Sequence, residues 1–212
     1  MERMKQEWAA FKALPLQKKL EHIWIYYKWH LVAAAAVICL IVSIIGTVVN
    51  SRKEVLISGM FLNNATSQEG YAFLEEGFRE DCGGSGDQLV ELVTSRSINF
   101  TADTPSQQEA SSFMIFTCMV AAQTLDYVVT DEASVAHLAE QEVLMDLRTL
   151  LPEESLAQWD TIEHDGVVTA LRLEGTAFGE NYPLAAEHSC IAVIINAPHR
   201  DNTIRFLDYI RG

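Results

Sequence analysis

The stretch "EVLISGMFL", residues 54–62, is almost entirely apolar and is followed at once by the turn-rich segment "NNATSQEG". An apolar run of this length, bounded by turn residues, predicts a strand that is buried on both faces. Similar runs follow in "QLVELVT" (88–94), "LDYVVTD" (125–131) and "CIAVIINAP" (190–198). Residues 161–173 indicate a hairpin around the turn His164-Asp165-Gly166.

Helical patterns alternate with these strands. We expect helices at about 67–80, 106–123, 132–142 and 201–211, with further helical turns between 143 and 160. Ser67 and Ser106 are suited to cap the first two helices, and Asp201 or Asn202 the last. Fully apolar strands alternating with helices predict a single α/β sandwich domain, residues 51–212, with a largely parallel sheet.

Two segments of this domain resemble extracytoplasmic substrate-binding proteins of ABC importers. In the first, an acid-ended strand precedes a turn of the type G-x-L-x-D-L, matched here by Asp126, Asp131, Leu144, Asp146 and Leu147, with Gln141 or Glu142 in place of the glycine. In the second, a strand that ends in Asn precedes a helix, matched by Tyr182, Pro183, Ile195, Asn196, Phe206 and Leu207. The resemblance covers about half of the domain. It implies one lobe of a periplasmic-binding-protein-like fold, without a second lobe to close over a solute.

A long apolar segment precedes the domain. Residues 31–49 contain no Asp, Glu, Lys or Arg, and as a helix they would extend about 28 Å, close to the thickness of a bilayer's hydrocarbon core. We therefore predict a transmembrane helix at 30–50, with the lipid bilayer as a partner. Trp and Tyr collect at the headgroup level, so the aromatic residues just before the span predict a membrane interface at Trp24, Tyr26, Tyr27 and Trp29.

The distribution of charge predicts the orientation. Residues 1–29 hold six basic and three acidic residues, whereas residues 51–212 hold nine basic and 26 acidic ones. Because basic residues near a span stay in the cytoplasm, we expect a cytoplasmic and interfacial N-terminal segment, 1–29, and an extracytoplasmic domain, 51–212. The acidic domain excludes nucleic acid as a partner. The segment "LQKKLEHIWIYYKWH" also resembles the start of single-pass membrane proteins of gut Firmicutes, which implies a bacterial cell envelope.

The cysteines and histidines give no sign of a metal or another cofactor. Cys82, Cys118 and Cys190 form no CxxC motif, and they fit either one disulfide with a free thiol or three reduced thiols. The histidines of the domain lack the spacing of metal ligands. We therefore expect neither a metal nor a cofactor.

Polar residues follow two of the predicted strands. In α/β sheets, ligands bind outside the carboxyl ends of parallel strands. These ends nominate a site for a small polar ligand at Asn63, Asn64, Ser67, Thr130 and Asp131. The same residue types also serve as turn and capping residues, which is the simpler interpretation.

The sequence favours binding over catalysis. In His188-Ser189-Cys190 the first and third side chains share a strand face, which allows a Cys–His nucleophile, but the start of an ordinary strand is the favoured interpretation. We expect a membrane-anchored extracytoplasmic module that binds a solute, a cell-envelope ligand or another envelope protein, without catalysis. The alternative is a structural accessory subunit of a membrane complex, because small residues at Ala33 to Ala36 and Gly46 allow close helix packing.

Overall fold

The computed structural model describes residue 39 and residues 54–84, 88–100 and 104–212. Every element below belongs to one compact unit, Lys53–Gly212. The predicted interface residues Trp24, Tyr26, Tyr27 and Trp29, and the predicted span apart from Cys39, lie outside the described residues. Within the described part of the chain, no helix has the length and apolar character needed to cross a bilayer.

The domain is built on one six-stranded sheet with the order β2-β1-β3-β6-β5-β4. The strands are β1 (Glu54–Leu62), β2 (Gln88–Arg96), β3 (Tyr127–Asp131), β4 (Thr161–His164), β5 (Val167–Arg172) and β6 (Ser189–Val193). The first three are parallel, but β6 pairs antiparallel with both β3 and β5, and β4 pairs antiparallel with β5. The prediction of a largely parallel sheet is therefore wrong for the second half of the chain. There β4 and β5 form a hairpin, and the connection from β5 to β6 contains only the short helix α8, so neither pair of strands has a crossover helix.

The helices lie close to their predicted positions. They are α3 (Gln68–Ala72), the π-helical turn η1 (Phe73–Gly77), α4 (Phe78–Asp81), α5 (Gln107–Ala121), α6 (Glu132–Glu140), the 3-10 turn η2 (Leu147–Thr149), α7 (Glu153–Leu156), α8 (Ala177–Asn181) and α9 (Arg200–Arg211). Ser67 caps α3, and Ser106 forms a capping box with Glu109 at the start of α5, as expected. The short helix α8 has no counterpart in the sequence prediction.

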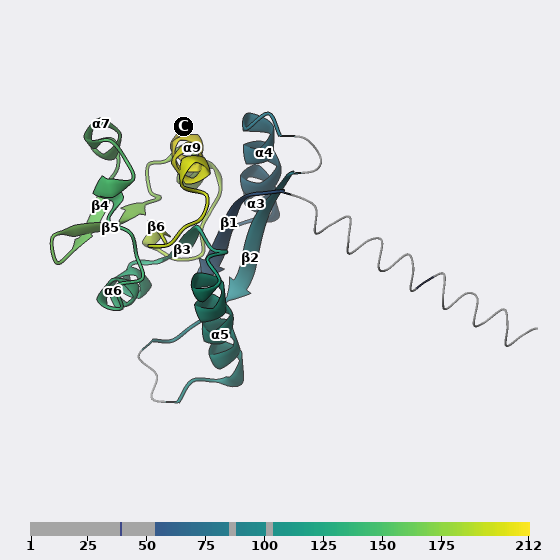
Figure 1. Cartoon of the computed structure of the whole chain (residues 1–212), viewed down its shortest axis with the longest axis vertical. Helices are drawn as coiled ribbons and strands as arrows, with labels where there is room; N and C mark the ends of the chain where they lie inside the picture. The colour runs from purple at the N-terminus through teal and green to yellow at the C-terminus, as the bar shows by residue number, and fades with distance from the viewer. Residues whose placement is uncertain (1–38, 40–53, 85–87, 101–103) are drawn as a thin grey trace, which may run out of the picture. The chain divides into compact units, whose positions relative to one another are not determined.

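Two hydrophobic layers, one on each face of the sheet, confirm the sandwich. Alternate residues of each central strand face opposite layers: Phe61 and Tyr127 belong to the layer that includes Phe78 and Phe206, from α4 and α9. Met60, Val128 and Ala192 belong to the other layer, with Phe116 of α5 and Val135 of α6. Figure 1 shows α4 and α9 on one side of the sheet and α5 and α6 on the other. The central strands are therefore buried on both faces, as their apolar sequences predict.

The start of α9 differs from the prediction. Its N-cap is His199 rather than Asp201 or Asn202. The buried carboxylate of Asp126, just before β3, accepts hydrogen bonds from the backbone N–H of His199 at 2.8 Å and from that of Ser58 at 2.8 Å. The Asn202 side chain instead donates to the carbonyl of Leu56 at 2.7 Å. An acid from a neighbouring strand thus satisfies the helix end, which the local sequence could not reveal.

Candidate functional site

The ends of β1, β2 and β3 meet at one edge of the sheet, because these three strands are parallel. Asn63 follows β1 with a left-handed backbone (φ 54°). Its side-chain oxygen accepts from the Ile98 N–H at 2.9 Å, and its amide nitrogen donates to the Ser134 hydroxyl at 2.9 Å. Asn63 therefore fastens the segment after β2 to the start of α6.

Asp131 ends β3 and caps α6. Its carboxylate accepts from the Ser134 N–H at 2.8 Å and from the Ser134 hydroxyl at 3.0 Å. Since Asn63 also donates to Ser134, the ends of β1 and β3 are joined through this one serine. Asn63 and Asp131 therefore lie side by side at this edge, and their role as ligand contacts stays a prediction.

Of the other three nominated residues, Asn64 and Thr130 are buried and Ser67 is half-buried. Asn64 is buried, and its amide donates to the Ser189 hydroxyl at 2.9 Å. Ser67 caps α3 by accepting from the Gly70 N–H at 3.1 Å. Thr130 is fully buried inside the sheet, where its hydroxyl has no partner among the described residues. Their roles as ligand contacts stay predictions, and the contacts seen for Asn64 and Ser67 are structural.

Two adjoining cavities open at this edge, beside α5 and α6. One has a volume of about 650 Å³ and is lined partly by Asn63, Asp131, Ser134, His137 and Glu140. The other has a volume of about 580 Å³ and is lined largely by α5, including Phe113, Met114, Thr117 and Cys118. They share the residues Ile98, Asn99, Phe100, Glu109 and His137, so they adjoin along this shared wall. We call the pair of cavities the α5–α6 groove, defined by the lining residues named in this paragraph.

The groove has a polar end and an apolar end. Phe100 packs on the ring of His137, with 4.5 Å between the ring centroids, at the junction of the two. The His137 ring also hydrogen-bonds the Gln141 side chain at 2.9 Å. Hydrogen bonding with Ser106 lowers the pKa of the Glu109 carboxyl, which keeps it ionised at neutral pH. Such a surface offers apolar area together with negative charge.

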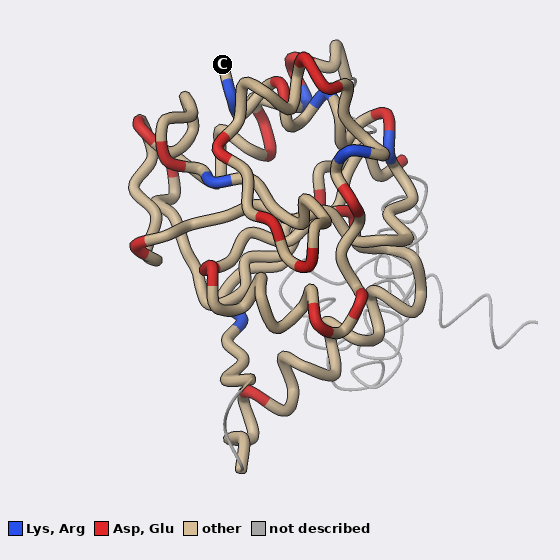
Figure 2. The backbone as a smooth tube through the Cα atoms, turned by 90° about the vertical axis from the view of Figure 1, so that its left-hand side faces the viewer, with Lys and Arg blue, Asp and Glu red and all other residues tan. Residues whose placement is uncertain are grey.

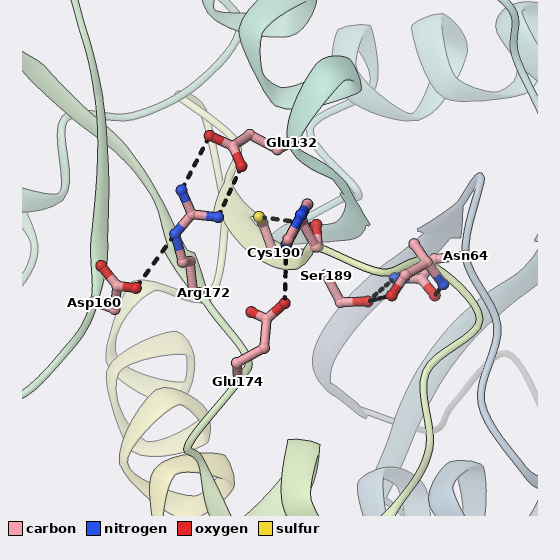
Figure 3. A network of polar contacts seen from close by, with 9 residues as sticks. Asn64, Glu132, Asp160, Arg172, Glu174, Ser189 and Cys190 are labelled. Atoms are coloured by element: carbon pink, nitrogen blue, oxygen red, sulfur yellow. Dashed lines mark hydrogen bonds and ion pairs between the residues drawn. The ribbon is translucent and has the colours of Figure 1, made fainter.

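A second polar network lies at the same edge of the sheet, where β5 ends and β6 begins (Figure 3). Arg172 holds Glu132 with two hydrogen bonds, of 2.7 and 3.0 Å, and approaches the Asp160 carboxylate at 3.3 Å. The Arg172 guanidinium lowers the pKa of the Glu132 carboxyl. This network joins α6 to β5, and the positive charge of Arg172 faces the carboxylates of Glu132 and Asp160.

Cys190 lies beside this network but is not activated as a nucleophile. Its side chain is fully buried, and its thiol donates to the His188 carbonyl at 3.4 Å rather than to the imidazole. Burial raises the pKa of the Cys190 thiol to about 12. The imidazole of His188 instead lies 3.7 Å from the Glu174 carboxylate, at the surface. The geometry therefore favours the start of an ordinary strand over a Cys–His nucleophile.

The remaining thiols are free in the described residues. Of the two alternatives left open by the sequence, the structure thus has three reduced cysteines and no disulfide among Cys82, Cys118 and Cys190. Cys118 is exposed on α5 and lines the groove. Cys82 is half-buried and burial raises the pKa of its thiol, so Cys118 is the most exposed of the three thiols of this domain.

Sequence reasoning missed the apolar half of the groove. Phe113 and Met114, within the helix predicted at 106–123, are 44% and 66% exposed. The run Phe113-Met114-Ile115-Phe116 was the available signal. Four consecutive large apolar residues point in all directions around a helix, so they cannot all face one core.

Comparisons with known proteins do not assign the chain to a family. No family model matches it, and no curated protein matches it. Among solved structures, it is similar to the ABC substrate-binding protein Lmo0181 from Listeria monocytogenes in complex with cycloalternan, with a TM-score of 0.37 and 12% identity. The match covers 56% of this chain and 29% of the Listeria chain. A similarity this partial supports no conclusion on ligand or mechanism, so the function is inferred from the contacts of this domain.

Proposed function

We propose that the chain is a membrane-anchored extracytoplasmic module that binds a ligand in the α5–α6 groove. The observation that carries this proposal is the position of the groove, at the carboxyl ends of three parallel strands. Ligands of α/β proteins bind at this kind of edge. Asn63 and Asp131, nominated from the sequence alone, both line it. The ligand is a small polar molecule or part of another envelope protein, and the proposal includes no catalytic step.

The proposed location rests on the sequence before the domain. The uncharged run of residues 31–49 has the length of a membrane span, and basic residues gather ahead of it. The acidic character of the domain suits a position in solvent, away from an anionic membrane surface. Figure 2 shows acidic positions spread over the described backbone, with fewer basic ones among them.

Cys118 provides a test of this location. A membrane-impermeant maleimide added to intact cells is expected to label the full chain mainly at Cys118, which is exposed, because Cys190 is buried and Cys82 is half-buried, both with a raised pKa. In Cys118→Ser, labelling is expected to fall to a low level. The measurement is the mass of the labelled chain, before and after lysis. Labelling of Cys118 that appears only after lysis would place the domain in the cytoplasm and refute the proposed orientation.

Ligand binding is tested by thermal stability. A ligand present at about 100 times its Kd stabilises the native state by about 2.7 kcal/mol, and this raises the Tm of the full chain in mild detergent. Sugars, short peptides and metal ions are the probes. Ala136, exposed on α6, lines the groove, so Ala136→Trp is expected to fill it and abolish the shift. The matched control is Ala157→Trp, an exposed alanine that follows α7 and lies outside both cavities.

The accessory-subunit alternative makes a different prediction in the same experiment. If no probe raises the Tm, and the chain co-purifies with a partner only when residues 15–50 are present, the contacts lie in the predicted span. That pair of results would replace the binding proposal by the accessory one. It is favoured by the small residues Ala33 to Ala36 in the span.

A further inference from the structure

Helix α5 has two apolar faces, and only one of them packs against the domain. Ser112 and Phe116 are buried, with Phe116 packed in the hydrophobic layer beneath the sheet. The opposite face is exposed and repeats at spacings of three and four residues: Ala110, Phe113, Met114, Thr117, Cys118 and Ala121. This spacing is that of a stripe against which a second helix packs. It lies along the apolar end of the groove, which Ala110, Phe113, Met114, Thr117 and Cys118 line.

The rim of the groove is negative and is not neutralised. Glu109, Asp131 and Glu140 line it, and none of them forms an ion pair with Lys or Arg among the described residues. By contrast, Glu132 and Glu163 each pair with an arginine elsewhere on the surface. Indeed the chain has no Lys or Arg anywhere from Ser97 to Leu147, the segment that supplies nearly all of the lining. A cation placed here would meet three carboxylates without a competing positive charge.

We infer that the ligand of this groove is a cationic amphipathic helix from another envelope protein, with its apolar side on α5 and its basic residues on the acidic rim. The inference rests on the proposed function and names the class of its ligand. Two features of the site carry it. The apolar stripe repeats over more than two turns of α5, as in helix-in-groove recognition. Met114 and Phe113 supply the adaptable and bulky contacts that such grooves use.

A second copy of this chain fits the groove less well. Pairing α5 with α5 would bring two sets of the acids Glu109, Asp131 and Glu140 toward each other, because both copies carry the same rim. Like charges at an interface oppose association. The partner that satisfies both the apolar stripe and the charge is a basic helix supplied from outside.

The test uses a synthetic peptide of about 18 residues, roughly five helical turns. Leu recurs in it at spacings of three and four residues, and Lys occupies the other positions. Three controls accompany it: the same pattern with Glu for Lys, the same composition in scrambled order, and a short oligolysine. The full chain is held in nanodiscs of zwitterionic lipid, and empty nanodiscs give the background. Binding is read by anisotropy of the labelled peptide and, independently, by protection of Cys118 from maleimide.

Single substitutions separate the two contributions. Met114→Lys is expected to lower the affinity for the Leu/Lys peptide by at least about tenfold, because it removes an apolar contact and adds a charge of the same sign as the peptide's. Glu140→Lys is expected to weaken it severalfold and to reduce its salt dependence. Two control variants lie outside both cavities: Ile195→Lys, which is the same kind of change at another exposed apolar residue, and Glu153→Lys on α7. Both are expected to leave the affinity for the peptide within about twofold of that of the unaltered chain.

Each outcome decides the inference. The inference is supported if the patterned Leu/Lys peptide binds, protects Cys118, and loses affinity in the two groove variants only. Equal binding of the Glu or scrambled peptides, or an unchanged affinity in Met114→Lys, would overturn it. If a sugar or metal ion raises the Tm and Ala136→Trp abolishes that shift, while the Leu/Lys peptide does not protect Cys118, the proposed function survives and this inference fails. If nothing binds in either experiment, both fail.

Discussion

Replacing Asp126 with alanine is expected to lower the free energy of unfolding by about 3–5 kcal/mol. The Asp126 carboxylate is fully buried and accepts three hydrogen bonds: from the backbone N–H groups of Ser58 and His199, both at 2.8 Å, and from the His199 imidazole at 2.9 Å. It joins β1, β3 and the start of α9 at a single point. Alanine would leave these donors without their acceptor, and each donor that stays buried and unpaired costs about 1–3 kcal/mol.

The measurement is proteolysis of the full chain in mild detergent after equilibration in urea, which reports the fraction unfolded at each concentration. Asp201→Ala is the matched control: Asp201 lies in the first turn of α9 and is exposed. Its loss removes only a favourable interaction with the helix dipole, about 0.3–1 kcal/mol. Equal midpoints for Asp126→Ala and Asp201→Ala would show that the buried carboxylate does not hold α9 to the sheet.

The elements of the domain could be predicted from sequence, whereas the strand directions could not. Strand β1 matches its predicted bounds because an apolar run ending at "NNATSQEG" has few other interpretations. The same kind of run in Ser189–Val193 forms an antiparallel strand, and nothing within it differs from a parallel one. Direction depends on the connection before it, where the β4–β5 hairpin reverses the chain and α8 is too short to act as a crossover.

The candidate site was predictable where it depends on strand ends and hidden where it depends on packing. Asn63 and Asp131 were found because parallel strands bring their carboxyl ends to one edge. Thr130 was nominated by the same rule, but its side chain is fully buried within the domain. The exposed stripe of α5 was not found, since the sequence shows that the helix is apolar but not which of its faces the domain covers.

Replacing Gly59 with alanine is the second change expected to have a large effect, about 3 kcal/mol of destabilisation. Gly59 lies in β1 directly opposite Tyr127 of β3. A Cβ atom at this position would come within 2.5 Å of both Cε2 and the hydroxyl oxygen of Tyr127. The ring cannot move away, because it is fully buried and stacks on Phe206 with 4.6 Å between the ring centroids. The glycine is therefore required by the close approach of an aromatic ring and not by its backbone angles.

A double-mutant cycle tests this explanation by the same urea-dependent proteolysis. Tyr127→Leu removes the ring, so in that background Gly59→Ala is expected to cost less than about 1 kcal/mol. Ser58→Ala, at the next position of the strand, is the control, because its buried hydroxyl has no partner among the described residues and its loss is expected to be close to neutral. If Gly59→Ala were equally costly with and without the Tyr127 ring, the constraint would lie in the backbone of β1. The sheet would then tolerate no side chain at this position, whichever residue β3 placed opposite it.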